Sequence, residues 1–130
     1  MPVTVVAIRE RAPNERRVAL SPEVAKKLKG LGASVLIESG AGGGANLPDS
    51  AYPGAEATAQ ARDALARADV LLKVQPPTLE EIAALREGSV LISYLQPHAD
   101  PERTRALRDR KITSFAMELL PRTTRAQAMD

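Results

Sequence analysis

Five short apolar runs, separated by stretches that suit helices, constrain the fold of this chain more than any other feature. The runs are rich in β-branched residues and leucine, lack an alternation of polar and apolar residues, and occupy 3–8, 34–38, 70–74, 89–95 and 112–117. Strands of this kind are covered on both faces. Their alternation with helical segments is typical of βαβ units. We therefore expect an α/β fold with a parallel sheet flanked by helices on both faces, Rossmann-like or flavodoxin-like.

Capping residues mark where most of these helices begin and end. Helix N-terminal signals, in which a capping side chain precedes Pro or acidic residues, occur at Ser21–Pro22, Thr78 and Asp100–Pro101. Gly30, Gly32 and Gly88 are expected to end the first two of these helices. The alanine-rich stretch Ala55–Ala68 is also compatible with a helix, and Thr123 and Thr124 can cap a last one.

The length and composition exclude several classes of protein. The 130 residues suit one domain, 1–130. Because the chain has no cysteine, it has no disulfide, no thiolate zinc site and no thiol nucleophile. It has no run of about 18 apolar residues and no basic segment before an apolar run at its start. We therefore expect no direct membrane insertion, no secretory signal and a cytoplasmic location.

Charge and aromatic content argue against nucleic-acid binding. The net charge is +2, and the two most basic stretches, 9–17 and 100–111, contain both signs. A surface that neutralises a phosphate backbone carries mainly one sign. The three aromatic residues, Tyr52, Tyr94 and Phe115, are too few for a stacking platform. We expect no nucleic-acid partner.

The loops that follow the expected strands are the places to look for a binding site. Ligands of parallel α/β sheets bind at the carboxyl ends of strands, near a point where the strand order reverses. These loops are 9–17, 39–47, 74–78, 95–100 and 118–127.

The glycine-rich segment Gly40–Ala45 satisfies the pattern GxGxxA after an expected strand. A dinucleotide site would need a helix to start at once, so that its N-terminus meets the pyrophosphate. Here Asn46–Asp49 follows, and no ribose-binding acid at the end of a second strand lies about 20 residues further on. We interpret the segment as a turn or a point of close backbone packing.

Two cations near strand ends are candidate ligands of a substrate. Arg17 precedes a helix on a strand-exit loop, where its planar fork can bind a carboxylate or phosphate; the alternative is a solvated basic loop. Lys73 lies within an apolar run and needs a partner or a cleft. The alternative for Lys73 is a structural ion pair with a carboxylate such as Asp69 or Glu118.

The single histidine, His98, lies in a loop. A single histidine excludes a multi-histidine metal site and gives little support to a Ser-His-Asp triad, so no metal is expected.

The last segment holds more promising polar groups. If a helix begins at Thr124, Gln127 and Asp130 share one face. Gln127 can bind a carboxamide and Arg122 a phosphate or carboxylate; the alternative is a solvated tail.

A set of motifs gives the chain a resemblance to a known family over its whole length. The motifs are Ile8–Glu10, Glu15–Pro22, Glu38–Gly42 and Leu72–Val74. In this order and spacing they resemble the N-terminal domain that alanine dehydrogenase shares with the alpha subunit of proton-translocating NAD(P) transhydrogenase. Alanine dehydrogenases carry a catalytic His in a Leu-His pair after the fourth strand, where this chain has Leu95–Gln96. The run Pro121–Asp130 resembles the transhydrogenase version, so both differences favour transhydrogenase.

The resemblance implies roles for the candidate residues. Transhydrogenase residues that match Arg122, Gln127 and Asp130 lie beside the nicotinamide of NAD(H) and orient it for hydride exchange with NADP(H) bound by another subunit. These three are the expected catalytic and cofactor-binding residues. Residues that match Arg17 and Lys73 bind pyruvate in alanine dehydrogenase, which keeps that enzyme as an alternative, although the missing His argues against its acid–base step.

The resemblance also implies a larger assembly. We expect a following Rossmann domain that binds NAD(H), a homodimer, and partnership with the transhydrogenase beta subunit and a membrane-spanning subunit. The location would then be cytoplasmic and peripheral to the inner membrane. A single domain forms half a cleft and cannot hold two rings at near-attack distance, so we expect the 130-residue piece to be inactive and to bind NAD(H) weakly. A second alternative is a non-catalytic binding module of the same fold.

Overall fold

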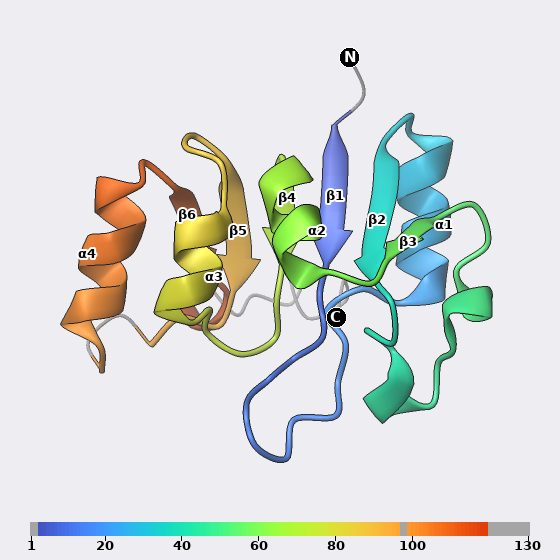
Figure 1. Cartoon of the computed structure of the whole chain (residues 1–130), viewed down its shortest axis with the longest axis horizontal. Helices are drawn as coiled ribbons and strands as arrows, with labels where there is room; N and C mark the ends of the chain where they lie inside the picture. The colour runs from blue at the N-terminus through green and yellow to red at the C-terminus, as the bar shows by residue number, and fades with distance from the viewer. Residues whose placement is uncertain (1–2, 97–98, 120–130) are drawn as a thin grey trace.

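A computed structural model describes residues 3–96 and 99–119. Its centre is a six-stranded, entirely parallel sheet with strand order β3-β2-β1-β4-β5-β6 (Figure 1). The strands are β1 (Thr4–Ala7), β2 (Ser34–Glu38), β3 (Glu56–Thr58), β4 (Val70–Leu72), β5 (Val90–Ser93) and β6 (Thr113–Ala116). The helices are α1 (Pro22–Gly30), α2 (Ala61–Arg67), α3 (Leu79–Ala84) and α4 (Pro101–Asp109). Single 3-10 turns occur at Gly43–Ala45, Asp49–Ala51 and Met117–Leu119. The expected α/β architecture is confirmed.

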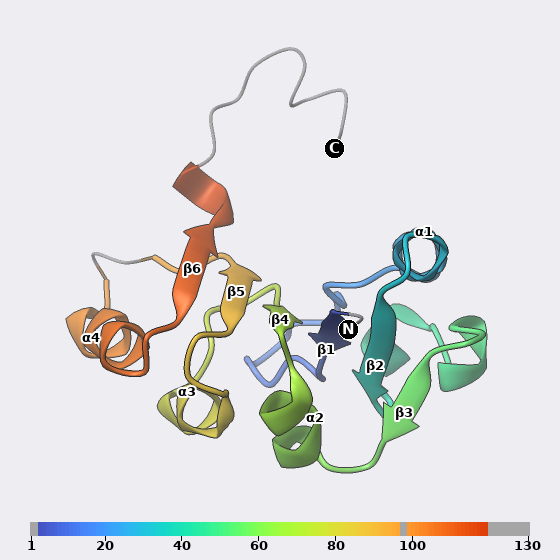
Figure 2. The same cartoon turned by 90° about the horizontal axis from the view of Figure 1, so that it is seen from above.

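Helices cover the two faces of the sheet unequally. Figure 2 shows α2, α3 and α4 on one face and α1 on the other. Successive strand residues point to opposite faces, so Val6 packs in the core beneath α2–α4 and Ala7 in the core beneath α1. The larger of these two cores extends to Leu107 of α4, whereas the α1 core reaches only Leu72 of β4. Half of the α1 face therefore lacks a covering helix among the described residues.

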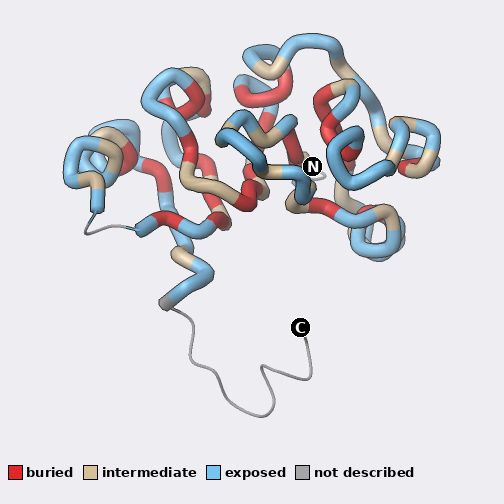
Figure 3. The backbone as a smooth tube through the Cα atoms, turned by 90° about the horizontal axis from the view of Figure 1, so that it is seen from below, coloured by how far each residue is buried: buried red, intermediate tan, exposed pale blue. Residues whose placement is uncertain are grey.

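The buried residues gather in the middle of the sheet. In Figure 3 they follow the strands and the inner sides of the helices, whereas loops and outer helix turns are exposed. Val6, Leu71 and Leu91 lie on the three neighbouring strands β1, β4 and β5, and all three are fully buried. Strand β6 differs, because it lies at the edge of the sheet and its first three residues are exposed.

The capping signals work as the sequence predicts. The Ser21 hydroxyl accepts a hydrogen bond from the backbone N–H of Val24 at the start of α1. Thr78 and Glu81 form a reciprocal capping box at the start of α3. The Asp100 carboxylate caps α4 by accepting from the backbone N–H of Arg103.

The expectation of one helix over Ala55–Ala68 is wrong. Its first part is the edge strand β3, and only Ala61–Arg67 is helical. Strand β3 pairs with β2 in the register Ile37–Ala57, and the backbone N–H of Ser39 donates to Thr58. Pairing with a neighbouring strand thus overrides the helical propensity of alanine. In the described part of the chain, no helix is long and apolar enough to cross a membrane.

Candidate functional site

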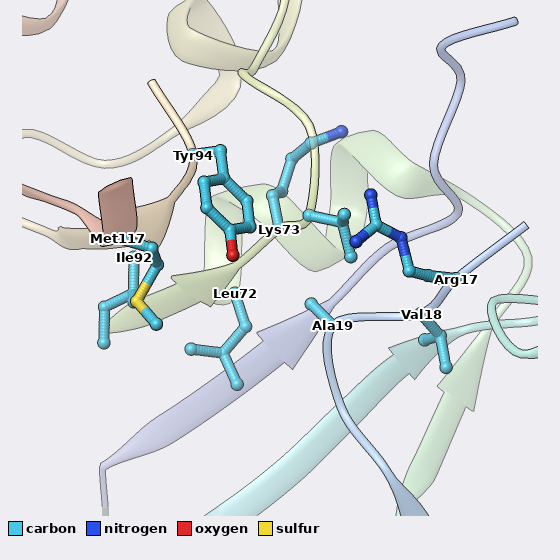
Figure 4. Close-up of a pocket in the computed structure, with 9 residues that line it drawn as sticks. Arg17, Val18, Ala19, Leu72, Lys73, Ile92, Tyr94 and Met117 are labelled. Carbon is cyan, nitrogen blue, oxygen red and sulfur yellow. The ribbon is translucent and has the colours of Figure 1, made fainter. Parts of the chain in front are cut away.

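A pocket of about 290 Å³ opens near the carboxyl ends of the central strands. From β1 the chain continues to β2 on one side and later to β4 on the other, so this is the point where the strand order reverses. Figure 4 shows its lining, which is Arg17, Val18, Ala19, Leu72, Lys73, Val74, Ile92, Tyr94 and Met117. The structure thus brings both sequence-predicted cations to one pocket.

Part of the pocket wall belongs to an apolar row across three strands, of which Leu72 and Ile92 line the pocket. Leu72 is in register with Ile92, and Ile92 with Phe115, so the three side chains share the α1 face. Helix α1 does not reach this part of the face (Figure 2). Phe115, Tyr94 and Met117 are consequently exposed. The row offers a flat apolar surface that suits a ring or a short hydrocarbon group.

Arg17 is held in place by a carboxylate beneath it. Its Nε and Nη2 donate to the two oxygens of Glu15 at 2.9 and 2.8 Å, and Gln75 donates to the same carboxylate at 2.6 Å. The Arg17 side chain is 64% exposed, whereas that of Glu15 is 7% exposed. The hydrogen bonds from Arg17 and then from Gln75 lower the pKa of Glu15 to about 2. Arg17 is thus oriented and retains Nη1 as a donor for an anion.

The lowered pKa of Glu15 leads to a testable prediction. We expect its carboxyl to titrate near pH 2 and to move toward its ordinary value near 4.5 in Arg17→Ala, because the largest stabilising bond of the anion is lost. Because the folded pKa lies below the unfolded one, this contact stabilises the fold above about pH 4.5 and is lost as the pH falls toward 2. Carbon-13 NMR of the carboxyl measures the midpoint. Arg16→Ala is the control, and an unmoved midpoint in Arg17→Ala would contradict the assignment.

Lys73 is buried in an ion-paired cluster, which agrees with the structural alternative. Its ammonium lies 3.3 Å from Glu10 Oε1 and 3.4 Å from Glu81 Oε1, and its side chain is 2% exposed. Figure 4 shows that it extends away from Leu72, as alternation along a strand requires. Glu10 is fixed from the other side, because it also accepts hydrogen bonds from the backbone N–H groups of Val74 and Gln75.

The expected partners of Lys73 were wrong. Asp69 instead pairs with Arg86 and accepts from the backbone N–H of Thr4. Glu118 accepts from the backbone N–H groups of Leu95 and Gln96. Burial raises the pKa of Glu118, and these backbone bonds more than offset that effect, so its pKa is lowered overall.

The Lys73 cluster continues into a second group of charges, in which Glu38 is buried and Arg11 is exposed. Glu81 Oε2 has no hydrogen-bond partner among the described residues and lies 4.0 Å from Nη1 of Arg11. Arg11 donates from both Nη atoms to buried Glu38, at 3.0 and 2.6 Å. The hydrogen bond with Glu38 raises the pKa of Arg11. Charge pairs therefore join the loop after β1 to the end of β2, to Lys73 directly after β4, and to helix α3.

The glycine-rich segment is a site of close backbone packing, as expected. A Cβ on Gly42 would lie 2.6 Å from the carbonyl oxygen of Leu47, and one on Gly44 would lie 3.0 Å from that of Arg16. Turn hydrogen bonds occupy its backbone N–H groups at Ala41, Gly43 and Ala45, and Gly40 donates to Asp49. These donors do not converge on an open space, so the segment does not fit a pyrophosphate.

Several predicted residues lie outside the described part of the chain. These are His98, Arg122, Gln127 and Asp130, together with the helix expected after Thr124. Their roles stay predictions. Within residues 3–96 and 99–119, no group of three or more His, Asp or Glu is placed to hold a metal ion.

Sequence reasoning did not single out the residues that orient the two cations. Glu10 and Glu15 looked like part of a mixed-charge loop, and Glu81 looked only like an acid in the first turn of a helix. One signal for these residues was available in the sequence: loop 9–17 contains acidic residues, and an isolated lysine in an apolar strand needs an acidic partner. A buried lysine needs carboxylates, but spacing along the chain does not say which ones.

Comparisons with known proteins agree with this geometry. Residues 6–130 match the family described as "Alanine dehydrogenase/PNT, N-terminal domain". The chain is 49% identical over 129 residues to an NAD(P) transhydrogenase alpha subunit of Rhodospirillum rubrum, covering 94% of this chain and 34% of that protein. It resembles the crystal structure of transhydrogenase from Sinorhizobium meliloti, with 46% identity, a TM-score of 0.91, and coverage of 98% and 38%. An L-alanine dehydrogenase structure is more distant, with 32% identity, a TM-score of 0.83, and coverage of 88% and 32%.

Proposed function

The chain belongs to the alanine dehydrogenase/PNT N-terminal domain family, and from this premise we propose that it is the N-terminal portion of an NAD(P) transhydrogenase alpha subunit. It spans about a third of the length of the curated relative from Rhodospirillum rubrum. The proposed activity of the complete protein is hydride transfer between NAD(H) and NADP(H), coupled to proton translocation. A following Rossmann domain would bind NAD(H), and another subunit would bind NADP(H).

The residue at position 96 carries this proposal over the alternative. Gln96 stands where the resemblance to alanine dehydrogenase would require a catalytic histidine. Its backbone adopts φ of +47°, and its N–H donates to Glu118 at 2.6 Å. A glutamine amide neither accepts nor releases a proton near neutral pH, so it cannot assist the reduction of a carbonyl. Direct hydride exchange between nucleotides needs no such proton transfer at this position.

Lys73 also supports the proposal. With Glu10 and Glu81 both at its ammonium, the cluster carries one more negative than positive charge. That environment disfavours a third carboxylate, such as that of a 2-oxo acid. Arg17 and Lys73 nevertheless line one pocket, which keeps alanine dehydrogenase as the second candidate.

The pocket fits one part of NAD(H) and not another. Its apolar wall of Leu72, Ile92 and Met117 suits the face of a nicotinamide ring, which supplies the hydride when the nucleotide is bound. In the glycine-rich segment the backbone donors of Gly40, Ala41, Gly43 and Ala45 are engaged, so the segment does not suit the phosphates. We therefore propose that this domain contributes a wall at the nicotinamide end, with Arg122, Gln127 and Asp130 beside the ring, and that the next domain binds the phosphates.

The proposed setting follows from the family. The complete subunit would be a homodimer that associates with the beta subunit and a membrane-spanning subunit. It would therefore lie on the cytoplasmic side, peripheral to the inner membrane. The relatives' description as subunit alpha supports partner subunits in general.

The test uses the complete protein that contains this chain, assembled with its partner subunits in membrane vesicles. We expect NADPH-dependent reduction of an NAD⁺ analogue and no amination of pyruvate with NADH. The Gln96→His variant, which has at position 96 the histidine that amination needs, is assayed for the same two reactions. Robust amination by the unmodified protein, without transfer between nucleotides, would establish the alternative instead.

A further inference from the structure

The loop between β1 and α1 exposes its arginines and buries its carboxylates. Arg9, Arg11 and Arg16 are exposed at the carboxyl edge of the sheet. The side chain of Glu10, in the same loop, is 1% exposed, and its carboxylate accepts hydrogen bonds from the loop after β4. The outward surface of this loop is therefore rich in guanidinium donors although the loop as a whole contains both signs of charge. We call Arg9, Arg11 and Arg16 the arginine ledge.

The glycine-rich segment lies against two of the three arginines of the ledge. A Cβ on Gly40 would lie 3.8 Å from Cδ of Arg9, and one on Gly44 would lie 3.0 Å from the carbonyl oxygen of Arg16. The two arginines thus meet opposite ends of one short segment. Figure 1 shows the loops after β1 and β2 running close together beyond the ends of these strands. Arg9 and Arg16, which lie at different points of the loop between β1 and α1, are thereby brought to the same edge of the sheet.

Two of these guanidinium groups are available to a partner. In the described part of the chain, Arg9 and Arg16 make no side-chain ion pair or hydrogen bond. Arg11 uses both Nη atoms on Glu38 and retains Nε, and its side chain is 44% exposed. A basic surface that its own chain does not neutralise is complementary to an acidic one.

The surroundings of the arginine ledge favour a protein over a free phosphate as its binding partner. A phosphate site usually combines cations with converging backbone N–H groups. Here the turn hydrogen bonds of segment 40–46 engage the donors at Ala41, Gly43, Ala45 and Asn46. Arg9 and Arg16 flank the segment at its two ends, and neither belongs to the lining of the pocket described above. This open arrangement suits acidic side chains spread over a protein surface.

We propose that the arginine ledge docks an acidic surface of the subunit that carries NADP(H). The inference rests on the proposed function. Two nicotinamides exchange hydride only when they nearly touch, so the partner subunit must approach the edge of this domain where the pocket opens. The ledge is at that edge, because Arg16 is the immediate neighbour of pocket residue Arg17. Charges beside such a contact steer association and fix its orientation.

The test measures association of the complete alpha subunit with the isolated NADP(H)-binding subunit. The variant is Arg9→Glu with Arg16→Glu, and the matched control is Arg105→Glu with Arg108→Glu, two exposed arginines of α4. At about 0.01 M salt we expect the dissociation constant of the ledge variant to rise about tenfold or more, and the control to match the unmodified protein. At about 0.15 M salt, where the Debye length falls from about 30 to about 8 Å, the difference is expected to shrink.

Affinity for NADH and circular dichroism are measured on the same variants. Unchanged NADH affinity with weakened association supports the ledge. Unchanged association overturns it, and so does a loss of NADH affinity, which would assign these arginines to the nucleotide. If the double reversal misfolds, Arg9→Gln with Arg16→Gln replaces it and must weaken association in the same direction. If the unmodified protein transfers no hydride between nucleotides, the proposed function fails. If it does transfer hydride but the ledge variants associate normally with the partner subunit, only the inference about the ledge fails.

Discussion

Replacing Lys73 by methionine is expected to lower the free energy of unfolding by about 3–5 kcal/mol, because it leaves two buried carboxylates without their cation. Methionine approximates the length of the aliphatic stem, so packing changes little. Glu10 and Glu81 then face each other across the space that the ammonium occupied at 3.3 and 3.4 Å. Urea denaturation of the 130-residue chain, followed by circular dichroism, measures the change.

Two further variants separate charge from packing at this site. Lys27→Met removes an exposed lysine whose ammonium lies 3.9 Å from Glu23, and it is expected to change stability by about 0.5 kcal/mol or less. Lys73→Met with Glu81→Gln removes one of the two stranded charges while leaving an oxygen that can accept from Thr78, so it is expected to recover part of the loss. If Lys73→Met were no more costly than Lys27→Met, the cluster would not stabilise the fold.

The strands illustrate how much of this fold local sequence determines. The five apolar runs all form strands, and each of those strands lies within its predicted range. Burial on both faces selects continuous apolar sequence in the inner strands, and that signal is visible without a structure; the edge strand β6 was predicted from its apolar run too, although most of it is exposed. The sixth strand, β3, carries no such signal because only three residues form it and two of them, Glu56 and Thr58, are polar. Its pairing with β2 is a property of the assembled sheet.

The candidate site, like the fold, could be predicted from the sequence only in part. Position near a strand end made Arg17 and Lys73 candidates, and both line one pocket, because the carboxyl ends of parallel strands meet at one edge of the sheet. The partners of these cations required the path of each loop. Glu10 reaches Lys73 although they are far apart in sequence, whereas Asp69, much nearer in sequence, lies at the other end of β4 and pairs elsewhere. A strand separates its two ends in space, so closeness in sequence misled the prediction.

In the complete protein, Gln127→Ala is expected to lower the rate of hydride transfer between nucleotides by about 100-fold, since losing the group that orients a reacting ring misplaces it. The residue would supply both a donor and an acceptor to the carboxamide of the nicotinamide, and alanine supplies neither. The affinity for NADH is expected to fall much less, because the phosphates would bind to the next domain. Stopped-flow transfer rates and NADH titration measure the two effects separately.

Ala128→Ser is the matched control, because it lies in the same segment at a position to which no role or contact is assigned. It is expected to leave the transfer rate within about twofold of the unmodified protein, an effect small beside the loss predicted from misorientation. Equal effects of the two substitutions would mean that the segment acts only through its folding. A drop in NADH affinity as large as the drop in rate would mean that Gln127 binds the nucleotide without orienting the ring. A selective loss of rate in Gln127→Ala is therefore the result that would tie this segment to the transfer step, because orientation affects the reaction more than binding.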